Sequence, residues 1–311
     1  MPTRKLVSFD WAMKKLLRSK ANFDILEGFL SELLKDDIQI LEILEGESNQ
    51  EERGNKFNRV DLKVRNRNNE LLIIEVQHER ELDYLQRVLF GAAKVITEHL
   101  REGEPYSAVV KVISVNILYF DLGQGSDYVY HGTTSFLGIH NQDRLRLSVS
   151  QQNLYRKQEV QQIFPEYYLI KVNSFNDIAK DSLDEWIYFL KHEEIKEEFY
   201  AKGLMKAKHE LDIMKLPEQE RRAYERHRDD LHYQASMFES SYSAAVLEGR
   251  KEGLQEGRME GMKDGEKKKA LQIARNLLQA GGLDLSSIAA MTELPEEELI
   301  ALKRELDNSH D

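Results

Sequence analysis

The chain contains no cysteine. Disulfide bridges and zinc sites built on thiolates are therefore excluded, and the absence suits a reducing cytoplasm. No run of about twenty apolar residues occurs either, so no helix is predicted to span a membrane. Residues 1–20 carry basic groups but lack the continuous apolar core of a signal peptide. These absences favour a cytoplasmic protein with no membrane partner.

Excess positive charge is also missing. The 311 residues include 44 Lys and Arg against 55 Asp and Glu, which gives a net charge of −11. That balance disfavours a broad affinity for nucleic acid, although net charge says little about one local site. The nine His are scattered, and none has the spacing to an acidic partner that would indicate a metal site. With 41% apolar residues, the chain is long enough for one substantial soluble domain and an appendage.

One constellation of residues is typical of a chemical site. Two β-like runs, 59–65 and 71–77, flank a polar turn over 66–69. A loop of two or three residues makes Asp61 face Glu75 or miss it by one position. Because side chains alternate along a strand, Glu75 and Gln77 then project from one face beside Asp61. Two carboxylates and an amide suit a hard divalent cation.

An ordinary strand remains an alternative for the same residues. Glu75 lies in an otherwise apolar run, where burial of an unpaired charge would cost several kcal/mol or leave the group protonated. A metal ion, a cationic partner or a solvent cleft would each remove that penalty. The alternative is a strand whose Glu faces water or a neighbouring Arg, and the spacing alone does not distinguish the two.

Basic residues gather around Asp61. Between residues 53 and 69 it is the only acid, and the basic residues are Arg53, Lys56, Arg59, Lys63, Arg65 and Arg67. Phosphate binding needs such cations to replace released counterions, so Arg59, Lys63 and Arg65 are candidates for nucleic-acid contact. Alternatively, they keep a solvated sheet edge soluble.

The remaining pattern predicts an α/β fold with the sheet covered on both faces. A helical period runs through residues 9–45, and residues 175–240 are helical and heavily charged, with His227 and His232 expected on the surface. The other expected elements are a helix over 82–100 and strands over 109–120, 127–136, 144–149 and 167–172.

A glycine repeat precedes the C-terminal residues. Gly recurs every fourth residue from Gly249 to Gly265, and an acid precedes each one. Each Gly costs about 1 kcal/mol relative to Ala in a helix interior. Acids spaced by four also repel one another, so an isolated helix should be marginal. Either the stripe lets another helix approach closely, which would support a homo-oligomer, or the segment is a solvated linker.

Three short helices are expected over 270–278, 285–291 and 296–306. Ser286 or Asp284 would cap the second, and Pro295 opens the third. A helix-turn-helix can read DNA, but the third helix begins with three consecutive Glu, which would repel phosphate. A module for packing or oligomerisation is therefore favoured over a reader of the DNA groove.

The flanking chain adds a resemblance to a known family. From Phe9 to about Tyr119 it resembles the PD-(D/E)XK nuclease superfamily, and more narrowly the Rpn group, recombination-promoting nucleases also labelled transposases. Residues 9–17 are similar to that group's opening helix, with Asp10 and Lys14 at its polar positions. The likeness continues less sharply to about residue 190 and again in the glycine-rich tail.

The acidic hairpin carries the same resemblance. Asp61 and Glu75 fall at the family's two acidic positions. Gln77 stands where most of the superfamily has Lys, although the Rpn group commonly has Gln there. Its amide can hydrogen-bond a water but cannot act as a cation or a base near neutral pH.

The resemblance implies a restriction-endonuclease-like core, in which a mixed β-sheet is flanked by helices, and a helical C-terminal extension. The expected parts are a nuclease-like domain over 1–190, a charged helical segment over 191–245, the glycine repeat over 246–269 and a small helical tail over 270–311.

It also implies a metal-dependent DNA endonuclease. Mg²⁺, or a similar ion such as Mn²⁺ or Ca²⁺, would be held by Asp61, Glu75 and the Val76 carbonyl, with Gln77 as the further catalytic position. Asp10 and Lys14 are secondary candidates whose alternative role is capping and solvation. Two other functions stay open: a nuclease-like binding scaffold with weak or no activity, and an accessory to recombination or transposition that cuts only with a partner.

Overall fold

The computed structural model describes residues 6–44 and 61–308. It divides the chain into two compact units, residues 1–233 and 234–311. Each unit has its own buried apolar cluster, and each is described here by itself.

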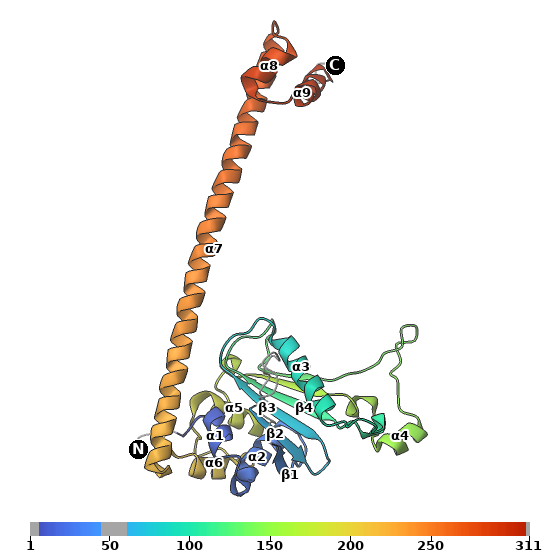
Figure 1. Cartoon of the computed structure of the whole chain (residues 1–311), viewed down its shortest axis with the longest axis vertical. Coiled ribbons are helices and arrows are strands. Elements are labelled where there is room, and N and C mark those ends of the chain that lie inside the picture. Colours follow the sequence, from blue (N-terminus) through green and yellow to red (C-terminus); the bar gives the residue numbers. More distant parts are fainter. Residues whose placement is uncertain (1–5, 45–60, 309–311) are drawn as a thin grey trace. The chain divides into compact units, whose positions relative to one another are not determined.

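A mixed six-stranded sheet forms the centre of the first unit (Figure 1). The strand order is β1-β2-β3-β4-β6-β5, in which β3, β4 and β6 are parallel and the remaining neighbours are antiparallel. The strands are β1 (Ile40–Leu44), β2 (Leu62–Asn66), β3 (Leu71–Gln77), β4 (Val112–Leu118), β5 (Val129–Gly132) and β6 (Glu166–Lys171). Fold class and mixed sheet are as the sequence predicts.

Helices cover both faces of this sheet, because alternate strand residues are apolar on each side. Leu72 and Ile74 of β3 face a large cluster that includes Phe29 and Trp186, whereas Leu71 and Ile73 face the opposite side. The helices of the first unit are α1 (Phe9–Lys15), α2 (Phe23–Leu34), α3 (Tyr84–Glu98), α4 (Val149–Tyr155), α5 (Ser182–His192), α6 (Leu204–Glu210) and the start of α7 (Glu218–Ala280). Of these, α3 packs on the side of Leu71, and α1, α2 and α5 contribute to the large cluster.

Two local predictions are wrong. The helical period over 9–45 ends at Leu34, where Lys35 adopts φ of 54°, and residues 40–44 form β1 instead. The Glu27 side chain of α2 accepts from the Ile40 N–H at 2.7 Å, which anchors the start of that strand. The strand expected over 144–149 is also absent from the described chain. Ser148 instead forms a capping box with Gln151 that starts α4.

In the second unit the glycine repeat lies inside the helix α7. The C-terminal part of that helix packs with α8 (Leu285–Thr292) and α9 (Glu296–Asn308) around Ala274, Ile288 and Leu299. The Asp284 side chain accepts from the Ser287 N–H at 2.8 Å, so Asp284 caps α8. Within the described ranges, no helix has the length and apolarity needed to cross a membrane.

Candidate active site

The hairpin of β2 and β3 brings the two acidic residues together. Asn69 adopts φ of 56° in the polar turn that the sequence predicts over 66–69. The register pairs Leu62 with Ile74, so its continuation by one residue sets Asp61 beside Glu75. By strand alternation, Gln77 then lies on the same face of β3 as Glu75. This arrangement follows from the spacing of the two strands.

Asp61 precedes β2 and contacts two elements. Its Oδ2 accepts from the Val76 N–H at 2.7 Å, and its Oδ1 lies 3.7 Å from Lys14 Nζ on α1. Burial raises the pKa of the Asp61 carboxyl, and the hydrogen bond from Val76 and the charge of Lys14 oppose that rise only in part. The carboxyl therefore lies in a largely buried position beside the Lys14 ammonium.

Glu75 carries an ionisable side chain but is only 6% exposed. Its Oε1 accepts from the Arg87 guanidinium of α3, which also bonds Glu81 at 2.6 Å. Burial raises the pKa of Glu75 to about 7, and Asp61 and Glu81 add to the rise while Arg87 opposes it. The position therefore holds too little positive charge to keep this carboxylate fully ionised at neutral pH.

Gln77 reaches away from the two carboxylates. Its Nε2 donates to Glu81 Oε1 at 3.0 Å and to the Glu79 carbonyl at 3.3 Å. The amide thus shares Glu81 with Arg87. These bonds fix the side chain at the edge of the site, where its carbonyl oxygen is the group able to accept from a water.

Asp10 and Lys14 lie at the same site, together with a histidine that the sequence did not indicate. Asp10 is 2% exposed, its Oδ1 lies 2.7 Å from Lys14 Nζ, and its Oδ2 lies 3.2 Å from His227 Nε2 of α7. Burial raises the pKa of Asp10, but the contacts with His227 and Lys14 lower it by more, so its pKa lies below the usual range. His227 is therefore not the surface residue that the sequence suggested.

Lys14 connects the two acids. Burial lowers the pKa of the Lys14 ammonium, but Asp10 and Asp61 raise it by more, and the ammonium stays charged. His78, directly after β3, stacks on Tyr119 with ring centroids 4.4 Å apart, and burial lowers its pKa. No local spacing could have indicated these histidines, because their partners are distant in the sequence.

The donor set fits a divalent cation. Two carboxylates and the Val76 carbonyl are hard oxygen ligands, the type that Mg²⁺ and Ca²⁺ prefer. The raised pKa of Glu75 is the physical sign that further positive charge would be stabilising there. Among residues 6–44 and 61–308, no cluster of three or more His, Asp or Glu side chains could hold a metal ion. A site at the hairpin would thus depend on two acids and a backbone oxygen.

The candidate phosphate contacts are less available than the sequence suggests. Arg59 lies outside the described residues. Lys63 is 8% exposed and its Nζ lies 3.4 Å from Glu98 of α3, while Arg65 Nε bonds Glu42 at 2.9 Å. Both described cations are therefore already engaged within the sheet and its covering helix.

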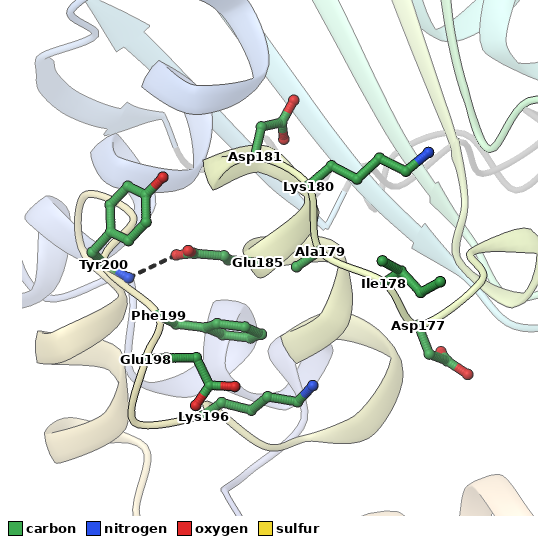
Figure 2. Close-up of a pocket in the computed structure, with 10 residues that line it drawn as sticks. All are labelled: Asp177, Ile178, Ala179, Lys180, Asp181, Glu185, Lys196, Glu198, Phe199 and Tyr200. Carbon is green, nitrogen blue, oxygen red and sulfur yellow. Dashed lines mark hydrogen bonds between the residues drawn. The ribbon is translucent and has the colours of Figure 1, made fainter.

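A separate pocket of about 470 Å³ lies between the start of α5 and the chain before α6 (Figure 2). Figure 2 shows the Glu185 side chain pointing at the Tyr200 N–H. Glu185 Oε2 accepts hydrogen bonds from the Tyr200 N–H at 2.8 Å and from the Ala201 N–H at 2.7 Å. These two bonds give the buried carboxylate a structural role, because they hold the chain around Tyr200 and Ala201 in place. The pocket contains none of the candidate residues.

The fold and the acidic hairpin define a protein of the PD-(D/E)XK nuclease type. A family model described as PD-(D/E)XK nuclease family transposase matches residues 7–241, and the chain belongs to this family. The resemblance found in the sequence is thereby confirmed. Neither a curated protein nor a solved structure matches the chain.

Membership suggests a nuclease-like or transposase function with DNA as the substrate. Nucleases of this family generally use divalent metal ions.

Proposed function

We propose that this protein is a metal-dependent DNA endonuclease that hydrolyses phosphodiester bonds, in a role that promotes recombination or transposition. The observation that carries the proposal is the pairing of Asp61 with Glu75 on the β2–β3 hairpin, inside the region matched by the family. Both carboxyls are largely buried, and the pKa of each is raised. Perturbed carboxyls of this kind are typical of functional sites.

Asp61, Glu75 and the Val76 carbonyl would hold the metal ion, with Mg²⁺ as the expected species. When bound, it would lower the pKa of a water ligand and offset charge on the phosphate oxygens. Other residues of the chain position the two carboxylates. The Val76 N–H orients the Asp61 carboxylate, and Arg87 orients Glu75.

Lys14 would supply the cation that Gln77 cannot. Its ammonium lies 3.7 Å from Asp61 Oδ1 and is held by the buried Asp10. A charged amine beside the metal ligands can stabilise the negative charge that develops on a phosphate in the transition state. Gln77 would contribute a hydrogen bond to water.

Plasmid nicking tests the proposal. Purified protein is assayed with Mg²⁺, Mn²⁺, Ca²⁺ or EDTA, beside Asp61→Ala, Glu75→Ala and the control Glu42→Ala, which removes an exposed carboxylate from β1. We expect metal-dependent cuts that both site variants lose and the control keeps. Equal nicking by all four proteins would place the activity elsewhere. Folded proteins that never cut would favour a nuclease-like binding scaffold.

A second experiment tests the role of Gln77. We expect Gln77→Lys to nick faster than the unmodified protein, by roughly tenfold, because a cation at this position can help orient or activate the attacking water. The control Gln77→Met retains the length of the side chain and removes its polar atoms. An inert Gln77→Lys variant with unchanged thermal stability would contradict the hypothesis that Gln in place of Lys at this position slows the chemistry.

A further inference from the structure

Residues 133–158, here called the arm, differ in charge from the rest of the molecule. The whole chain has 55 acidic residues in 311, but the arm has one, Asp143. Its basic residues are Arg144, Arg146, Arg156 and Lys157. The arm follows the edge strand β5 and includes α4, and Figure 1 draws it in green, extending away from the sheet.

The arm has a defined backbone. The Gly138 N–H donates to the Asp143 carbonyl at 2.8 Å, and the Leu145 N–H donates to the Phe136 carbonyl at 3.0 Å, which closes a small hairpin. Phe136 packs on Phe164 with ring centroids 5.3 Å apart. The charged side chains are therefore presented from an ordered segment.

Three of its four cations are available to a ligand. Lys157 is paired with Glu70 at 3.1 Å. Arg144, Arg146 and Arg156 are exposed, and none of them forms an ion pair with any residue of the described ranges. An exposed guanidinium keeps five N–H donors in a planar fork that matches a phosphate.

The β2–β3 hairpin, which carries Asp61 and Glu75, has few cations free for a phosphate backbone, because Lys63 and Arg65 already bind acids of the same unit. We infer that the arm binds the phosphate backbone of the duplex DNA that the acidic hairpin cuts, through Arg144, Arg146 and Arg156. The choice of DNA rests on the proposed function. Such contacts position a duplex without reading its sequence, which suits three exposed cations in a segment that has a single acid, Asp143.

The test measures how binding depends on salt. The full chain in EDTA is titrated against a fluorescent DNA duplex between about 50 and 200 mM salt. The arm variant combines Arg144→Ala, Arg146→Ala and Arg156→Ala. The control variant combines Arg250→Ala, Arg258→Ala and Lys263→Ala, which removes equal charge from exposed positions of α7 that lie among acids.

We expect the arm variant to bind at least tenfold more weakly. The slope of log affinity against log salt should be shallower by roughly 2 to 3, because each lost phosphate contact removes about 0.9. The control should keep the slope of the unmodified protein. Melting temperatures of all three proteins establish that folding is intact.

Four results would overturn the inference: an arm variant with the original slope, equal losses in both variants, an unmodified protein that binds no DNA, or a strong preference for the RNA duplex of the same sequence. An oligomer that the arm variant dissociates, with DNA affinity unchanged, would assign the arm to protein contact.

Plasmid nicking separates this inference from the proposed function. Arm-dependent binding without any nicking contradicts the function alone, whereas unchanged nicking by the arm variant at limiting DNA contradicts the arm alone.

Discussion

At the scale of single residues, the buried carboxyl of Glu75 couples stability to pH. Its pKa rises from 4.5 in a free chain to about 7 in the fold, so between these values the folded state binds more protons than the unfolded state. The contribution of Glu75 to stability is therefore full below pH 4.5 and is lost as pH rises through 7. A change of this size corresponds to about 3 kcal/mol.

We expect the Glu75→Gln variant to lose this pH dependence. Urea unfolding in EDTA, measured from pH 4.5 to 8, should show the unmodified protein losing up to about 3 kcal/mol relative to the variant as pH rises. Saturating Mg²⁺ should restore most of that loss, because a bound cation stabilises the ionised carboxylate. Parallel pH profiles for the two proteins would mean that Glu75 titrates normally.

The buried Asp10 leads to a second expectation. His227→Phe retains a ring and removes the nitrogen 3.2 Å from Asp10 Oδ2. With one partner gone, Asp10 should draw the Lys14 ammonium away from Asp61, and we expect nicking to slow by roughly tenfold. His232→Phe, an exposed position of the same helix, is the matched control. Equal rates for the two variants would contradict a link between His227 and the site.

What the sequence could reveal about the site depends on distance along the chain. Asp61, Glu75 and Gln77 follow from strand alternation and a polar turn, both local patterns. Arg87 and His227 reach the carboxylates only through packing of α3 and α7, so no local spacing indicates them. Two expected phosphate ligands are likewise paired with acids that are distant in the sequence, Lys63 with Glu98 of α3 and Arg65 with Glu42 of β1.

At the scale of elements, the packing of α2 against the start of α6 depends on a glycine. A Cβ at Gly28 would lie 2.7 Å from the Lys202 carbonyl carbon and 2.9 Å from Gly203 Cα, distances that real Cβ atoms do not adopt. We expect Gly28→Ala to destabilise the first unit by roughly 1 to 3 kcal/mol, as overpacking does. The loss of stability is measured by urea unfolding, with tryptophan fluorescence as the signal. An unchanged unfolding midpoint would contradict this packing.

Glycines of the α7 repeat should behave in the opposite way. A Cβ at Gly257 would meet no atom of the described chain within 4 Å. Ala has the higher helix propensity, so Gly257→Ala should stabilise the helix by about 1 kcal/mol, measured by circular dichroism. A loss of helicity or of self-association would instead indicate that the glycine stripe allows close approach of another helix.

Elements were predictable where one pattern extended over most of their length. The central strands β3 and β4 are apolar and bounded by turn residues, and the structure has strands at both places. The apolar spacing of residues 40–44 continues the period of α2 and predicts a helix there. In the structure the left-handed conformation of Lys35 ends α2, and residues 40–44 pair with β2 as the strand β1. Tertiary hydrogen bonds outweighed local periodicity there.

At the scale of the whole molecule, the two compact units share no buried apolar cluster among the described residues, which predicts two unfolding events. Trp11 and Trp186 are both buried in the first unit, so tryptophan fluorescence reports on that unit alone. Leu299 has no exposed surface and lies in the small cluster of the second unit. Leu299→Ala removes buried methyl groups and should destabilise the second unit by roughly 2 to 5 kcal/mol.

Thermal unfolding with two probes checks this independence. In the Leu299→Ala variant, part of the helical circular-dichroism signal should melt at a lower temperature, while the fluorescence transition stays where it is in the unmodified protein. Ile300→Ala, the neighbouring half-exposed position, is the control and should change little. A fluorescence transition that shifts together with the helical signal would show that the units unfold as one cooperative body, because destabilisation of one cluster would then be felt by the other.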